Sequence, residues 1–239
     1  GIGSIDSAGS VSTDAGFSVI SYTGTGSNGT IAHGLGSAPQ VVLLKERNGT
    51  SNWLMSHQPL SASLGDYTRF MTLNSTGAVS GAGNIVFQGS AFTSSVFNVG
   101  ASSASNGSSQ TFIAYCFAEK KGYSKFSSYV GNGSNDGSFC FTGMKPSFVM
   151  IKRTSGTAAS WNIRDNKRNT FNPSDQVLYP HLSNAEATQT PLSIDILSNG
   201  FKLRGNDSDV NASGANYIYM AFAENPFVTG SSGIPATAR

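Results

Sequence analysis

The stretch SYTGTGSNG at 21–29 decides the fold, because it returns as SYVGNGSNDG at 128–137. Two further pairs of segments recur in the same order, at nearly the same spacing: APQVVLLKER at 38–47 with KPSFVMIKR at 145–153, and TFIAYCFAEK at 111–120 with NYIYMAFAEN at 216–225. Self-similarity at a fixed period is the signature of a repeated structural unit. We therefore expect two homologous units, each of about a hundred residues, which is the size of a small domain.

Each expected unit consists of strands. Short apolar and aromatic runs alternate with Gly, Asn and Ser clusters, a pattern typical of a β-sandwich or barrel. The first unit has runs at 17–22, 41–45, 53–56, 69–73, 85–87, 96–99 and 111–119, and the second has them at 126–130, 148–153, 161–165, 193–197, 201–204 and 217–224. The predicted fold class is all-β, with two tandem, homologous, jelly-roll-like β-sandwich units. Asn199–Gly200 favours a hairpin whose tight turn has positive φ.

Short flanks of small and polar residues enclose the two units. We expect residues 1–16 to form an extended N-terminal arm and residues 225–239 to form a C-terminal arm. The first sandwich is expected at 17–119 and the second at 123–224, joined by the short Lys120–Gly122 segment.

The composition excludes several classes of protein. Gly, Ser and Asn make up 36% of the 239 residues, only 12% are charged, and the net charge is +2. A coiled coil is far richer in Ala, Glu, Lys and Leu, and a disordered polyelectrolyte carries more net charge. No apolar run approaches the length of a membrane span, no secretion signal is visible, and the charge gives no general attraction to nucleic acid. The two cysteines, Cys116 and Cys140, are expected to be buried free thiols, with a bridge left open.

No catalytic motif is found in the chain. None of its three histidines has a second histidine at metal-binding spacing, and HExxH, CxxC, GxSxG and Walker-type sequences are absent. GTGSNG at 24–29 resembles a dinucleotide-binding loop, but no helix is expected after it, so we interpret it as a turn. We expect no enzymatic activity and no cofactor.

Three residues are candidate ligand contacts. Trp53 and Trp161 occupy matching places in the repeat, and an exposed indole can stack on a sugar ring. Because large aromatic residues are usually buried, we favour a core role for both. Arg164 is the third candidate, and the Arg164–Asp165 pair is expected to anchor a loop. The neighbouring cations Lys167 and Arg168 indicate a solvated loop more than a phosphate site.

The segment 206–211 offers oxygen ligands at alternating positions. Asp207 and Asp209 with the flanking Asn and Ser side chains suit a hard cation such as calcium. The same residue types crowd ordinary turns. We therefore predict a turn here and no metal site, and the calcium alternative stays open.

These residues also carry a family resemblance. SYTGTGSNG with HGLGSAPQVVLLKER, and GYSKFSSYVGNGSNDGSFCFTGMKPSFVMIKRT with WNIRDNKRN, resemble a repeat of virion structural proteins from tailed phages, especially phages of marine bacteria. The segment LSNGFKLRGNDSDVNASGANYIYMAFAENPF is similar to the C-terminal part of that repeat. The first unit lacks a clear N-x-S-G turn and has SNGSSQTF at 105–112 instead.

The resemblance implies a virion structural protein and no catalytic residues. A tail-fibre or other appendage subunit is the first expectation, assembled in the host cytoplasm and released by lysis. Its expected partners are other copies of itself, as a homotrimer by analogy, other virion proteins, and host surface polysaccharide. The alternatives are a capsid-attached decoration or head-fibre protein, and a secreted bacterial carbohydrate-binding or adhesin module.

Overall fold

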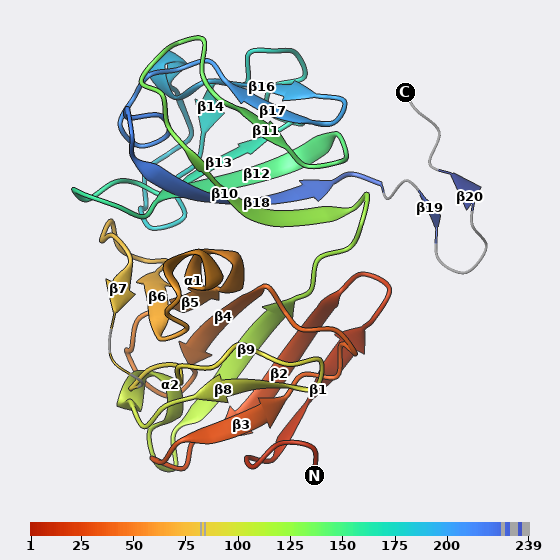
Figure 1. Cartoon of the computed structure of the whole chain (residues 1–239), viewed down its shortest axis with the longest axis vertical. Coiled ribbons are helices and arrows are strands. Elements are labelled where there is room, and N and C mark those ends of the chain that lie inside the picture. The colour runs from red at the N-terminus through yellow and green to blue at the C-terminus, as the bar shows by residue number, and fades with distance from the viewer. Residues whose placement is uncertain (82, 84, 226–227, 230–233, 236–239) are drawn as a thin grey trace. The chain divides into compact units, whose positions relative to one another are not determined.

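The computed structural model describes residues 1–81, 83, 85–225, 228–229 and 234–235 (Figure 1). Strands account for 40% of the described residues and helices for 6%, which confirms the all-β fold class. The chain divides into two compact units, unit 1 comprising Gly1–Asn74 with Val79–Glu119, and unit 2 comprising Ser75–Ala78 with Lys120–Arg239. The homology of the two units stays a prediction from the sequence.

Unit 1 pairs a large antiparallel sheet with a short one. Its elements are β1 (Ser7–Ser12), β2 (Phe17–Thr23), β3 (Gly29–Ala32), β4 (Val41–Glu46), β5 (Leu54–His57), α1 (Gln58–Leu64), β6 (Arg69–Thr72), β7 (Ser80–Gly81), β8 (Val96–Val99), α2 (Ser103–Asn106) and β9 (Thr111–Phe117). The large sheet has the strand order β1-β2-β9-β4-β5-β6-β7, and β3 pairs with β8. Figure 1 shows β3 and β8 as a second layer over the large sheet.

The alternation of side chains along the strands makes the core of unit 1. In β9, Phe112, Ala114 and Cys116 are buried while the residues between them are half-buried. Since successive strand residues point to opposite faces, one face of the sheet packs inward. Phe97 on β8 and Ile31 on β3 fill the core from the second layer.

Unit 2 has a four-stranded main sheet and smaller two- and three-stranded sheets. Its elements are β10 (Ser124–Val130), β11 (Phe139–Phe141), β12 (Pro146–Arg153), β13 (Asn162–Asp165), β14 (Gln176–Val177), β15 (Ala187–Thr188), the 3-10 helix η1 (Thr190–Leu192), β16 (Ile194–Leu197), β17 (Gly200–Leu203) and β18 (Asn216–Ala223). The sheets have the strand orders β10-β18-β12-β13, β11-β17-β16 and β14-β15. Val149, Ile194, Phe201 and Tyr217 are central to its buried core.

A buried asparagine closes the turn that follows β2. The Asn106 side chain is fully buried, and its Oδ1 accepts from the Thr25 N–H at 2.9 Å while its Nδ2 donates to the Ser27 carbonyl. The Gly26 N–H donates to the Asn106 carbonyl at 2.7 Å. We call this set of bonds the asparagine clasp. It fastens the end of β2 to the segment that leads into the central strand β9.

Unit 2 contains the same clasp. Asn211 is fully buried, its Oδ1 accepts from the Asn132 N–H at 2.9 Å, and its Nδ2 donates to the Ser134 carbonyl at 2.7 Å. The Gly133 N–H donates to the Asn211 carbonyl at 2.8 Å. The GTGSNG interpretation as a turn is confirmed, because β2 ends before it and strand β3, not a helix, follows it.

A tyrosine on the strand that precedes the turn supports each clasp. The Tyr22 hydroxyl donates to the Ser105 carbonyl, and the Tyr22 ring stacks on Phe112 with centroids 5.1 Å apart. In unit 2 the Tyr129 hydroxyl donates to the Val210 carbonyl at 2.7 Å, and its ring stacks on Tyr217 at 4.9 Å. In both units, a stacked pair of aromatic rings therefore lies beside the clasp, and the tyrosine from the strand before the turn is hydrogen-bonded to the residue just before the clasp asparagine.

Unit 1 also contains the counterpart of the N-x-S-G turn, although its sequence lacks that motif. In unit 2 the N-x-S-G turn ends at Gly214, which has φ +71° and whose N–H donates to the Gly131 carbonyl. Ser109 takes this place in unit 1, with φ +63° and an N–H that donates to the Gly24 carbonyl at 2.9 Å. The missing glycine hid the turn from sequence comparison.

Three sequence predictions need correction. Residues 7–12 of the expected arm form β1, which pairs along its whole length with β2, and Ile5 is buried in the core. Residues 85–87 form no strand, although Val86 and Phe87 are buried. The β16–β17 hairpin is confirmed, but neither Asn199 nor Gly200 has positive φ. Gly200 is required for another reason, since a Cβ there would lie 2.2 Å from the Cys140 carbonyl oxygen.

The expected C-terminal arm falls mostly outside the described residues. Within it, β19 (Val228–Thr229) and β20 (Ile234–Pro235) pair as antiparallel strands. Across the described ranges, no helix is both long and apolar enough to cross a membrane.

We predict that Ser109→Gly stabilises unit 1. A non-glycine residue in the left-handed region carries a conformational cost of about 1 kcal/mol, which glycine avoids. Chemical denaturation should show the free energy of unfolding rising by roughly 0.5–1 kcal/mol. Ser108→Gly is the matched control, because Ser108 lacks positive φ, and it should lower stability slightly. Equal effects of the two substitutions would contradict the proposed strain at Ser109.

Candidate functional site

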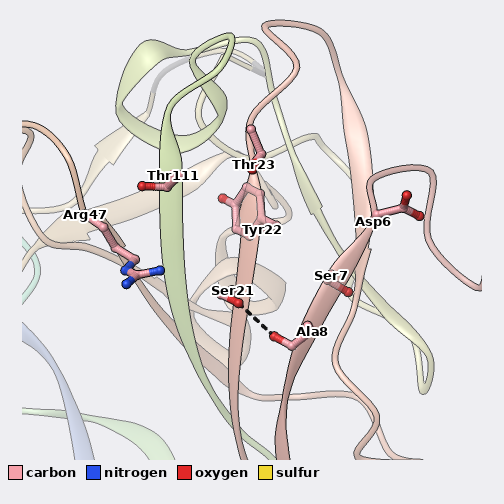
Figure 2. A pocket seen from close by; sticks show the side chains of 8 residues that line it. All are labelled: Asp6, Ser7, Ala8, Ser21, Tyr22, Thr23, Arg47 and Thr111. Atoms are coloured by element: carbon pink, nitrogen blue, oxygen red, sulfur yellow. Dashed lines mark hydrogen bonds between the residues drawn. The ribbon is translucent and has the colours of Figure 1, made fainter.

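An open groove with both polar and apolar lining crosses the large sheet of unit 1 near one end of its strands. Its volume is about 320 Å³. Figure 2 shows its walls: Asp6, Ser7 and Ala8 from the β1 side, Ser21, Tyr22 and Thr23 from β2, Thr111 from β9 and Arg47 just after β4. Strands distant in sequence thus supply the polar side chains that line one groove.

Two oppositely charged side chains, Arg47 and Asp6, lie on opposite sides of the groove (Figure 2). The backbone of Arg47 is fixed by its N–H, which donates to the Thr111 carbonyl at 2.7 Å, while its guanidinium is exposed. Asp6 is exposed at the start of β1. Within the described part of the chain, neither side chain forms an ion pair. A guanidinium and a carboxylate with free hydrogen-bonding capacity can bind opposite ends of one polar ligand.

Hydroxyl groups and backbone form the floor between these charges. The Ser21 hydroxyl donates to the Ala8 carbonyl at 3.1 Å, the bond drawn in Figure 2. Thr23 and Thr111 add two further hydroxyls, while the Tyr22 ring is buried and turned into the core. The floor therefore offers hydrogen bonds and no exposed aromatic face. This chemistry suits a hydroxyl-rich or zwitterionic ligand.

Trp161 lies in the core of unit 2, as predicted. It is 1% exposed, and the Lys152 ammonium lies 5.9 Å from its ring centroid. Lys152 is itself fully buried and donates to the Ala159 and Thr76 carbonyls at 2.8 and 2.9 Å. Burial lowers the pKa of Lys152 to about 8, against a smaller opposing effect of Asp209. Trp161 is unavailable for stacking on a sugar.

Trp53 is not the core residue that we predicted. Its side chain is half-buried and stacks on Tyr115, with ring centroids 6.0 Å apart and an interplanar angle of 26°. Tyr115 in turn stacks on Phe17 at 6.4 Å. The difference arises because Trp53 packs on residues of the outer face of the sheet, whereas Trp161 turns inward.

Arg164 is a structural residue in the interior of unit 2. It is 1% exposed and donates to the Leu192 carbonyl at 2.6 Å, which ties β13 to η1. Burial lowers its pKa to about 10. Asp165 anchors the loop that follows β13, as predicted: its Oδ1 accepts from the Lys167 and Arg168 N–H groups at 2.9 Å, and its carboxylate binds the Arg168 guanidinium at 2.6 Å. Lys167 binds Glu224 at 2.6 Å, so the basic residues are held by carboxylates.

The 206–211 segment forms the predicted turn. Asp207 Oδ1 accepts from the Asp209 N–H at 2.8 Å, and Asn211 is occupied by the clasp. Among the described residues, no three His, Cys, Asp or Glu side chains gather as a metal site would require. Calcium binding here has no support beyond the sequence pattern.

Both cysteines are free and buried, which confirms the predicted thiols. Burial raises the pKa of Cys116 and of Cys140 to about 12. Because the thiolate is the reactive form, neither side chain reacts readily in the folded units.

The sequence does not indicate the groove, because the residues that line it share no motif. Arg47 is the last residue of the repeated segment at 38–47, and Asp6 belongs to the expected arm. Both line the groove only because β1 pairs with β2. No sequence spacing indicates this arrangement.

The comparisons with known proteins gave one match. A family model described as "Domain of unknown function (DUF7483)" matches residues 1–226, and so spans both units. No curated protein and no solved structure matches the chain.

We predict that Lys152 makes the stability of unit 2 depend on pH. An unfolded lysine keeps its proton up to a pKa of about 10.4, whereas folded Lys152 releases it near 8. Between these values the unfolded state binds more protons, so stability rises with pH. Relative to Lys152→Met, the wild-type free energy of unfolding should gain on the order of 3 kcal/mol from pH 7 to pH 11. Both proteins share the same cysteines and tyrosines, so parallel pH profiles would contradict the prediction.

Proposed function

Since the chain belongs to the DUF7483 domain family, to which no function is assigned, we propose one from its geometry: a non-catalytic structural module of a phage virion, in a tail fibre or another appendage. The observation that carries the proposal is that buried polar side chains are hydrogen-bonded to the backbone inside both units. Asn106, Asn211, Lys152 and Arg164 all bind backbone carbonyls or amides inside the units.

Such bonds suit a part that must persist outside a cell. Buried polar groups that are bonded in this way rigidify a fold, because opening the fold leaves them unpaired in a low-dielectric interior. The resemblance of the 21–29 and 128–137 segments to phage repeats supports the virion setting. The low net charge of +2 adds little repulsion between neighbouring subunits.

The groove of unit 1 supports a role in contacting host surface polysaccharide. Sugars present rows of hydroxyls, and acidic bacterial sugars add carboxylates. Arg47 offers a cation for such a carboxylate, while Asp6 and the hydroxyls of Thr23 and Thr111 offer hydrogen bonds to the ring. Because the same groove would also suit a secreted carbohydrate-binding module, that is the second candidate function.

Labelling of particles tests the virion proposal. Antibodies against the purified chain are applied to gradient-purified particles from lysed cultures of the strain that carries the gene. We expect immunogold label on the tail or an appendage. Label on the head would instead identify the protein as a capsid decoration and contradict the appendage assignment. Antigen in the medium of unlysed cultures, with unlabelled particles, would contradict the proposal and favour the secreted module.

We predict that Arg47→Ala weakens binding of purified host surface polysaccharide by about 10- to 100-fold, the loss of one charged hydrogen-bonding group. Arg204→Ala is the control, since Arg204 is also exposed but lies in unit 2. Biolayer interferometry on immobilised polysaccharide gives the affinities. Equal binding by both variants would remove the groove from the proposal, and release of reducing sugar would overturn the non-catalytic assignment.

A further inference from the structure

We propose that β1 is a docking edge at which two copies of this chain join their large sheets through antiparallel β1–β1 pairing. The inference deepens the proposed function by naming a partner, and it rests on that function only for its biological setting. β1 is the first strand of the sheet order and pairs with β2 alone among the described strands. Five of its six residues are exposed.

Among the described residues, β3 lies against the chain only at the start of β1, where the Ile5 N–H donates to the Thr30 carbonyl and the Ser7 hydroxyl to the Ala32 carbonyl. The sequence of β1 itself contains none of the residues that usually protect a sheet edge. Natural proteins guard exposed edges with charges, proline, bulges or very short strands. β1 is SAGSVS, without charge or proline, and its register with β2 is continuous over all six residues. Val11 is 44% exposed. The exposed and regular part of this edge, residues 8–12, is a template for another strand.

The other sheet edges show that the fold does use these protections. β7 in unit 1 has only two residues. In unit 2, β13 carries Arg164 and Asp165 and is bridged to Leu178, while β10 contains Lys125. The contrast singles out β1 as the one long, uncharged edge of the described main sheets.

The direction of the free backbone groups can be derived. The Ala8 carbonyl accepts from the Ser21 hydroxyl, so it faces β2. Because hydrogen-bonding direction alternates along an antiparallel strand, Ser7, Gly9 and Val11 turn their N–H and C=O groups away from β2. These three residues provide the bonds for an added strand.

Charge and facing then select one register. Residues that face each other across the two strands must lie on the same face of the joined sheet. The two-fold axis that relates the copies therefore passes between the same β1 residue of each copy. An axis at Ser10 would place Asp6 opposite Asp14 of the second copy, which is repulsive. An axis at Gly9 places Asp6 opposite Ser12, Ala8 opposite Ser10 and Ser7 opposite Val11. Small side chains meet along this seam, so the strands can approach closely.

The joined sheet has a functional consequence. Asp6, Ser7 and Ala8 line the groove, so pairing at β1 brings the grooves of two copies onto one continuous sheet. Two linked sites bind a repetitive polymer far more tightly than one site does. A polysaccharide is such a polymer.

Sedimentation equilibrium tests the association. We expect the average mass of the full chain to rise toward twice 24.9 kDa as the concentration approaches millimolar. Val11→Pro removes an outward N–H and should lower the association constant at least tenfold. Val11→Ala keeps that N–H and should change it less than threefold. A mass of 24.9 kDa at every concentration, a limiting trimer mass, or unchanged association of Val11→Pro would overturn the proposal.

Disulfide trapping tests the register without weakening the edge. Ala8→Cys chains mixed with Ser10→Cys chains should form a mixed disulfide, since these residues are opposed when the axis lies at Gly9. The native Cys116 and Cys140 are buried and do not compete. Preferential trapping of Ala8→Cys with Ser12→Cys, or no trapping, would overturn the register. Neither measurement involves particles, so its failure is distinct from failure of the virion proposal.

Discussion

A single buried carboxamide in each unit joins the first core strand to the last. Asn106 binds the Thr25 N–H and the Ser27 carbonyl across 81 and 79 residues of chain, and Asn211 does the same for Asn132 and Ser134. Burying a polar group without partners costs several kcal/mol, roughly 2–7 by transfer from water. The turn after β2 and the segment before β9 therefore satisfy each other's polar groups, and separating them would leave these groups unpaired.

The clasp also determines where the groove lies. Thr23 ends β2 and Thr111 begins β9, immediately beside the clasped segments. The Gly24 N–H donates to the Gln110 carbonyl at 2.8 Å and so fixes the spacing of the two strand ends. Arg47 is anchored to the same place through the Thr111 carbonyl. The asparagine clasp of unit 1 thus also positions the strand ends that line the groove proposed to bind a glycan.

Local patterns predicted most of the strands but little of the site. Val41–Glu46 and Thr111–Phe117 were recognisable because burial on a sheet selects apolar and alternating side chains. β1 was not, because a strand of small polar residues has no hydrophobic signal and forms only against β2. The identical indoles of Trp53 and Trp161 differ in burial through long-range packing. The groove likewise depends on contacts between distant strands, which no local pattern encodes.

Thiol labelling under native conditions, resolved by peptide mass spectrometry, tests the clasp most directly. Cys116 reports on unit 1 and Cys140 on unit 2, and both are protected by burial. Asn106→Ala should accelerate labelling of Cys116, and Asn211→Ala that of Cys140, by at least tenfold, since unpaired buried groups cost about 1–3 kcal/mol each. The exposed Asn28→Ala and Asn135→Ala in the same turns should label at the wild-type rate. Wild-type rates for the two clasp variants would contradict the account.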